Sequence, residues 1–129
     1  MARITAKQIT SVNSKCSNGW VMNVLYYSSF GEKTLIKRIT LDEKNFLEFT
    51  LSYNSDNQIS LRISKYSHEP NETFAVSTGL GKSVILDETQ AKRKSVNNLI
   101  AFTEKLTDEK LLELEKDSKE ENIKGVVQS

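Results

Sequence analysis

The feature that most constrains the fold of this chain is an alternation of apolar and polar residues between positions 46 and 66. In the first half of this stretch every second residue is apolar: Leu47, Phe49, Leu51 and Tyr53. A polar loop at 54–57 follows, and the returning segment repeats the pattern at Ile59, Leu61 and Ile63. Because successive side chains of a strand point to opposite faces, the pattern predicts a β-hairpin with one face in the core and one in water.

Further segments extend the hairpin into a sheet and lead into a helix. Four of them have the composition of strands: 20–27, 34–41, 73–78 and 83–86. Asp87 and Gln90 then form an acidic variant of the capping box, which predicts the start of a helix. Apolar residues recur at helical spacing as far as Leu106, so we expect one long helix from about 88 to 106.

The predicted fold class is therefore α+β, with a curved antiparallel β-sheet of about six strands covered by one long helix. A short C-terminal helix follows. The expected core consists of the residues that face inward on both elements: Leu47, Phe49, Leu51, Ile59, Leu61, Ile63, Val96, Leu99 and Ile100.

The two ends of the chain are less regular. Residues 1–19 are polar, and 4–9 is either an edge strand or a loose arm. Thr107 is a suitable N-cap for the C-terminal helix. We expect one domain at 1–106 and an acidic helical tail at 107–129. The tail helix has an apolar side that favours a homodimer or higher homo-oligomer, formed by Leu111, Leu112 and Leu114.

Charge is distributed unevenly, although the net charge is only +1. Residues 1–103 carry 13 Lys and Arg against 9 Asp and Glu, a net of +4, whereas residues 104–129 carry 5 against 8, a net of −3. A basic body with an acidic tail favours a polyanionic partner. The alternative is that the tail is acidic only because it is a solvated helix.

The single cysteine, Cys16, cannot form an internal disulfide. The chain opens with no leader-like segment and contains no run of eighteen apolar residues. These features predict a cytoplasmic protein in a reducing environment, with no membrane contact.

One stretch is similar to a nucleotide-binding motif. Residues 77–83, Ser-Thr-Gly-Leu-Gly-Lys-Ser, look like the phosphate-binding loop of helicase-type ATPases, and 84–88 look like their metal-holding strand. A working phosphate loop opens a helix, and its acidic strand arrives from elsewhere in a parallel sheet. Here the two segments are contiguous, and Val76 replaces the first glycine. We therefore do not expect nucleotide hydrolysis.

Other chemistry lacks the necessary residues. His68 and Cys16 are the only side chains of their kinds, and neither has a partner at the spacing of a metal site or a catalytic triad. The chain is expected to be non-enzymatic, without a cofactor or metal.

The function expected instead is binding, on the sheet face that points away from the long helix. Single-stranded nucleic acid suits such a face, because phosphates contact Lys and Arg while bases stack on aromatic rings. The expected phosphate contacts are Lys37, Arg38, Arg62, Lys65 and Lys82, and the expected stacking surfaces are Tyr27 and Tyr66. Strict alternation places Arg38, Arg62 and Tyr66 on this face. It turns Lys37 and Lys65 inward, so these two need a bulge or a strand end to reach it.

The order of elements in the second half supports this expectation. Strand 59–66, Ile-Ser-Leu-Arg-Ile-Ser-Lys-Tyr, is followed by a loop with Pro70, then by 81–87, Gly-Lys-Ser-Val-Ile-Leu-Asp, and a helix. Over about 58–106 the chain resembles the positive-cofactor-four and Whirly type of single-stranded-DNA-binding domains. In that family a basic residue before the last strand and polar or aromatic residues on the open sheet face contact DNA, and the helices pair two subunits. The resemblance implies DNA contacts at Lys82, Arg62, Lys65 and Tyr66.

A second interpretation, from a different class, is a small protein-interaction module such as a chaperone, an inhibitor of a larger enzyme or a phage-type accessory factor. It requires only a helix face and an exposed sheet edge. Salt-dependent retention on an oligonucleotide column separates the two, because phosphate contacts release counterions.

Overall fold

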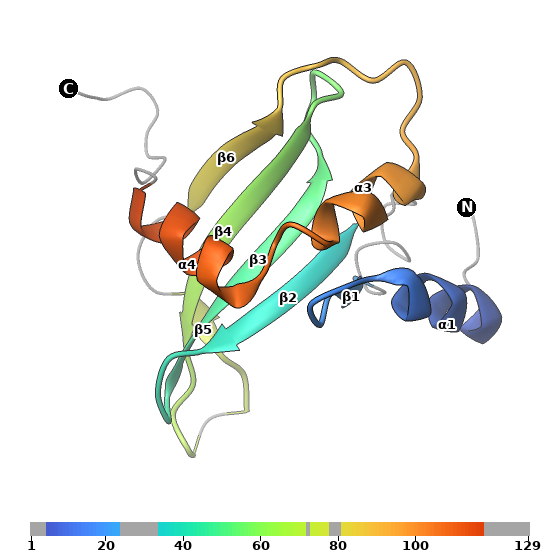
Figure 1. Ribbon diagram of the computed structural model, residues 1–129. Helices are drawn as coiled ribbons and strands as arrows, with labels where there is room; N and C mark the ends of the chain where they lie inside the picture. Colours follow the sequence, from blue (N-terminus) through green and yellow to red (C-terminus); the bar gives the residue numbers. More distant parts are fainter. Residues whose placement is uncertain (1–4, 24–33, 72, 78–80, 118–129) are drawn as a thin grey trace.

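The computed structural model describes residues 5–23, 34–71, 73–77 and 81–117, which form an α+β protein built on one antiparallel sheet (Figure 1). The strands are β1 (Val21–Met22), β2 (Leu35–Thr40), β3 (Asn45–Tyr53), β4 (Ile59–Ser67), β5 (Val76–Ser77) and β6 (Lys82–Asp87). The helices are α1 (Ala6–Lys15), α3 (Val96–Thr103) and α4 (Asp108–Asp117). Helices α3 and α4 lie on one face of the sheet, and α1 lies beside β1 (Figure 1). We call the opposite face of the sheet the outer face.

The central hairpin of β3 and β4 confirms the prediction from alternation. The two strands pair continuously from Asn45 opposite Ser67 to Tyr53 opposite Ile59. The loop between them is closed by the Asn54 side chain, whose Oδ1 accepts the backbone N–H groups of Asp56 at 2.8 Å and Gln58 at 3.0 Å. A side-chain acceptor of this kind replaces the backbone hydrogen bonds that a tight turn leaves open. The register fixes which face each residue of the hairpin occupies.

The two predicted strands after β4 share one edge of it. Tyr66 pairs with Ser77 on β5, and Ile63 pairs with Lys82 on β6. Among the described residues, β5 pairs with residues 66 and 67 of β4 and β6 pairs with residues 59–63, so the two strands occupy separate parts of the same edge. The stretch that looks like a phosphate loop leads into a strand of an antiparallel sheet, in place of the helix that such a loop requires.

The long helix predicted from about 88 to 106 is wrong in its first half. Helix α3 begins after Ser95, whose side-chain oxygen accepts the N–H of Asn97 at 3.2 Å. The Asp87 carboxylate instead accepts the N–H of Thr89 at 2.9 Å, within a turn. Two short helices, α3 and α4, cover the sheet in its place.

Helix α1 occupies the segment for which the sequence offered an edge strand or a loose arm. Thr5 and Gln8 form a complete capping box: Thr5 Oγ1 accepts the Gln8 N–H at 3.1 Å, and Gln8 Oε1 accepts the Thr5 N–H at 2.9 Å. Ile9, Val12 and Cys16 then fall on one side of the helix and pack against the core. Three partly buried side chains are enough to dock a helix whose start is capped.

The core lies between the sheet and the helices. Its buried members are Trp20, Met22, Leu35, Leu47, Phe49, Leu51, Ile59, Leu61, Ile63, Leu99, Leu106 and Leu111. The expected core residues of the central hairpin are all among them, as is Leu99, while Val96 and Ile100 are partly buried.

Helix α4 contributes to this core. Its capping is as predicted, because Thr107 Oγ1 accepts the N–H of Lys110 at 3.2 Å. Leu111 is fully buried and Leu114 packs against the same cluster, whereas Leu112 is 40% exposed. Most of the apolar side on which self-association was expected is thus covered by the chain's own core.

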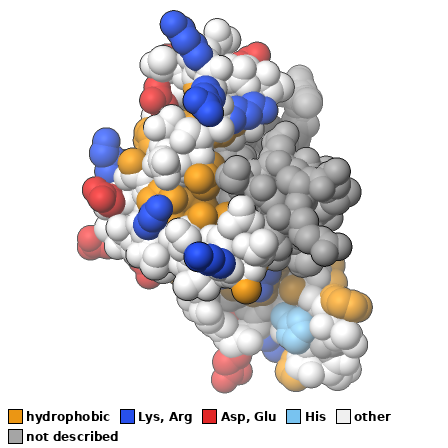
Figure 2. All heavy atoms as spheres, turned by 90° about the vertical axis from the view of Figure 1, so that its right-hand side faces the viewer, with side chains coloured by type: hydrophobic (Ala, Val, Ile, Leu, Met, Phe, Trp, Pro, Cys, Tyr) orange, Lys and Arg blue, Asp and Glu red, His pale blue; other side chains and the backbone are white. Residues whose placement is uncertain are grey.

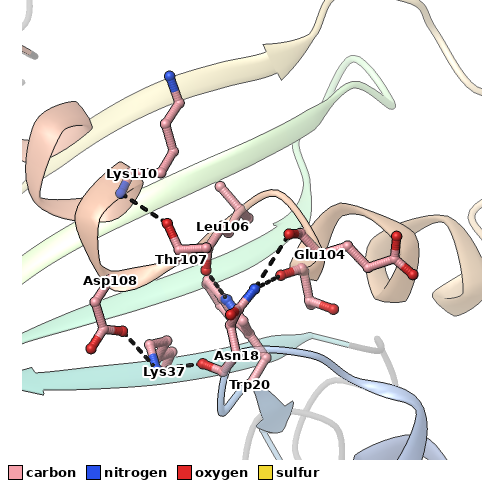
Figure 3. A network of polar contacts seen from close by, with 9 residues as sticks. Asn18, Trp20, Lys37, Glu104, Leu106, Thr107, Asp108 and Lys110 are labelled. Atoms are coloured by element: carbon pink, nitrogen blue, oxygen red, sulfur yellow. Dashed lines mark hydrogen bonds and ion pairs between the residues drawn. The ribbon is translucent and has the colours of Figure 1, made fainter.

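A network of polar contacts holds the turn after α1 against the connection between α3 and α4 (Figure 3). The Asn18 side-chain amide donates to the Thr103 carbonyl at 2.7 Å, and the buried Trp20 indole N–H donates to the Leu106 carbonyl at 3.1 Å. Both acceptors belong to the end of α3 and the residues just after it, where backbone carbonyls lack helical partners. The network therefore fixes the position of α3 relative to the first strand.

Within the part of the chain that the structure describes, none of the helices has the length and apolar character needed to cross a membrane.

Candidate nucleic-acid interface

Strand register brings three of the predicted binding residues together on the outer face. Arg38 on β2 lies opposite Glu48 on β3, which in turn lies opposite Ser64 on β4. Tyr66 and Arg62 lie two positions to either side of Ser64 and so share its face. The alternation in the sequence therefore placed Arg38, Arg62 and Tyr66 correctly relative to one another.

A ladder of stacked side chains runs across the outer face from β2 to β4. The rings of Phe46 and Tyr66 are stacked, with centroids 5.4 Å apart and planes inclined by 15°. The Arg38 guanidinium lies over the Phe46 ring, with Cζ 5.2 Å from its centroid. Arg38 Nε also donates to Glu48 Oε2 at 3.0 Å, so the guanidinium is held from two sides. We call Arg38, Phe46 and Tyr66 the outer-face ladder.

The ladder forms part of the wall of a groove of about 860 Å³ on the outer face. The groove lies where the β2–β3 turn meets the β4–β5 connection, and its lining includes Glu48, His68 and Phe74. Phe74 is 78% exposed, an unusual state for a phenylalanine. Figure 2, which views the molecule from the side of α1, shows hydrophobic side chains gathered around the histidine at this end. The groove therefore offers aromatic and apolar surface to a ligand.

The charges that line the groove nearly cancel. Asp42, Glu43 and Glu48 are acidic, whereas Arg38 and Lys44 are basic. The pKa of Asp42 is lowered because the Asn45 side-chain amide and the N–H groups of Lys44 and Asn45 donate to its carboxylate. This carboxylate holds the β2–β3 turn, so its charge is already compensated by hydrogen bonds. The groove itself offers little net attraction to a polyanion.

Arg62 provides positive charge on the outer face, and among the described residues no acidic side chain forms an ion pair with it. The residue is exposed on β4. It lies across the strand from Ser83 on β6 and opposite Thr50 on β3, both small neutral residues. A phosphate approaching Arg62 therefore meets no acidic side chain in the adjacent strand positions.

The structure places two of the predicted phosphate contacts on the other face of the sheet. The Lys37 ammonium forms an ion pair with Asp108 at 2.9 Å and donates to the Asn18 carbonyl (Figure 3). Lys82 Nζ forms an ion pair with Glu115 Oε2 at 2.9 Å and donates to the Glu115 carbonyl at 2.6 Å. Both lysines hold α4 against the sheet, so the structure does not bring them together with Arg38, Arg62 and Tyr66.

The remaining predicted positions divide between the end of β4 and the undescribed part of the chain. Lys65 is exposed on β4 and lies opposite Leu47, so the register assigns it to the face of the helices, as alternation indicated. Tyr27 lies outside the described residues. Phe46, Glu48 and Phe74 were not among the predicted site residues. Phe46 could have been found, because the hairpin register that pairs Tyr53 with Ile59 also pairs Phe46 with Tyr66.

No cluster of three or more His, Cys, Asp or Glu side chains among the described residues could hold a metal ion. Comparison of the chain with models of known protein families, with curated proteins and with solved structures gives no significant match. The resemblance to single-stranded-DNA-binding domains therefore stays a prediction, and the observations that bear on function are those of the outer face.

Proposed function

We propose that this protein binds single-stranded nucleic acid across the outer face of its sheet. The observation that carries the proposal is the combination of Arg62, an exposed arginine with no ion-pair partner among the described residues, with a ladder of stacked side chains that ends at Tyr66. Single strands are recognised by this pairing of features, because unpaired bases stack on rings while phosphates contact cations.

In the proposed complex, a base enters the groove and extends the outer-face ladder at Tyr66. The neighbouring phosphate contacts Arg62. Arg38 contributes a second cation, and its Nε–H bond to Glu48 orients the guanidinium before the ligand arrives. An arginine that is already ordered loses less side-chain entropy on binding than a free one.

Duplex nucleic acid does not fit this mode, because its bases are stacked on one another and are not free to enter the groove. Affinity for a single strand should therefore exceed affinity for a duplex of the same sequence. Among the described residues, the strands of the outer face offer two cations to phosphates, Arg38 and Arg62, far fewer than a typical duplex-binding surface uses.

The proposal is tested by titrating a fluorescently labelled twelve-residue oligonucleotide, single-stranded and as a duplex, with the full chain. Substituting Tyr66 by Ala should weaken binding of the single strand by roughly 5- to 150-fold, which corresponds to about 1–3 kcal/mol for one stacked base. The matched control is Lys110→Ala, which removes a cation from α4 on the opposite face.

Equal loss of affinity in the Lys110 and Tyr66 variants would place the ligand elsewhere. An absence of any binding to single strands at low salt would reject the proposal. The exposure of Phe74 and Val76, at 78% and 55%, would then favour the interaction-module interpretation, with a protein partner at the same end of the sheet.

A further inference from the structure

Gly81 lies directly beside the guanidinium of Arg62, one residue before the start of β6. A Cβ atom added to Gly81 would stand 3.3 Å from Arg62 Nη2 and 3.6 Å from Arg62 Cζ. It would also stand 3.6 Å from the carbonyl oxygen of Ile63. The Arg62 side chain thus lies against the backbone of the residue that precedes β6.

The backbone conformation does not explain why position 81 is a glycine. Its φ angle lies outside the left-handed range that favours glycine, unlike Gly19, whose φ is +83°. A β-branched or other L residue could adopt the same backbone. The group that a side chain at position 81 would crowd is the Arg62 guanidinium, which would have to shift to make room for it.

We propose that Gly81 is a positioning residue for nucleic-acid binding. Because it has no side chain, the Arg62 guanidinium can lie against its backbone on the outer face. This inference depends on the proposed function. It gives a role to a glycine of the stretch 77–83, which is similar to a phosphate-binding loop. An arginine side chain that lies against the backbone at position 81 presents its N–H donors in one direction. It therefore loses less conformational entropy when a phosphate binds. A side chain at position 81 displaces the guanidinium from this orientation.

The test uses graded substitutions at position 81 in the full chain, with the labelled single strand as probe. Arg62→Ala should weaken binding roughly tenfold, the scale of one charge-assisted hydrogen bond. Gly81→Ala should weaken it about threefold, because the end of the Arg62 side chain can partly give way. Gly81→Val should approach the full effect of Arg62→Ala, because valine fills more of the space that the guanidinium occupies. Valine is also compatible with a strand.

A double-mutant cycle distinguishes positioning from a general effect on the fold. In the Arg62→Ala background, Gly81→Val should cause no further loss of affinity, and its melting temperature should match that of the parent. An equal loss from Gly81→Val in both backgrounds would overturn the inference. The inference would also be overturned if Arg62→Ala weakened binding while both position-81 variants bound the single strand with unchanged affinity.

These outcomes separate the inference from the proposed function. If the unmodified chain binds no single strand, both the proposed function and the inference about Gly81 are rejected. If the chain binds and Arg62→Ala weakens binding, the proposed function stands, and the position-81 variants alone decide whether Gly81 positions the arginine.

Discussion

The Leu111→Ala variant should unfold at a markedly lower denaturant concentration than the unmodified protein, because α4 is part of the core. Leu111 is fully buried against the sheet, although it lies in an acidic segment near the end of the chain. Loss of three carbon atoms from an apolar environment costs about 2.4 kcal/mol at roughly 0.8 kcal/mol each. The cavity that is left adds to this cost, and α4 can shift to fill part of it, so we expect a total of about 3 kcal/mol.

Urea denaturation followed by tryptophan fluorescence measures this directly, since Trp20 is buried in the same cluster. With a slope of about 1.5 kcal/mol per molar urea, the midpoint should fall by about 2 M. Leu112→Ala is the matched control: its side chain is 40% exposed, and its loss should cost less than about 1 kcal/mol. Equal midpoints for the two variants would show that α4 is not packed as described.

Three further predictions concern individual polar contacts. Trp20→Phe removes the donor to the Leu106 carbonyl and leaves a buried acceptor without a partner, so thermal denaturation should show a loss of about 1–3 kcal/mol. Asp42→Ala should destabilise the protein at neutral pH. Because the folded pKa of Asp42 lies below its ordinary value of 3.8, its contribution is fully present above that value and is lost as the pH falls through the folded pKa. The stability gap between Asp42→Ala and the unmodified protein, measured by urea titration at several pH values, should therefore be constant down to about pH 5 and close below about pH 4. A double-mutant cycle between Lys82 and Glu115 should give a coupling of about 0.5–1 kcal/mol, since both side chains are partly exposed, and a value near zero would mean that the pair does not form in solution.

The sheet was predictable from the sequence because its side-chain period of two is rigid. Once the loop at 54–57 fixes the hairpin, every residue from 46 to 66 is assigned to a face and to a partner. The same alternation along 34–41 correctly placed Arg38 on the face of Arg62 and Tyr66 and correctly turned Lys37 inward.

Helix boundaries were less predictable, because capping signals occur in turns as well as in helices. The Asp87 carboxylate makes the same kind of bond to a backbone N–H in a turn that it would make at an N-cap. Conversely, Thr5 and Gln8 form a true capping box, but the segment after them has too few apolar residues for its periodicity to predict a helix.

The roles of Lys37 and Lys82 depended on the docking of α4, which local sequence patterns do not specify. Each lysine faces the helices and meets a carboxylate of α4, at Asp108 or Glu115. An inward-facing lysine on a strand also discourages edge-to-edge association, so such residues have a structural use that resembles a binding signal in the sequence. The composition of a sheet face alone cannot distinguish these two uses.

The salt dependence of oligonucleotide binding shows whether a single strand lies on the outer face, because it counts the phosphates that the protein neutralises. For a single strand the slope of log K against log salt is about −0.7 for each phosphate contact. The two cations that contact phosphates in the proposed complex, Arg38 and Arg62, predict a slope of about −1.4, whereas all five cations expected from the sequence would give about −3.5. A measured slope near −1.4 that becomes shallower, about −0.7, in Arg62→Ala would support binding on the outer face. A slope near −3.5, or one that Arg62→Ala leaves unchanged, would contradict it.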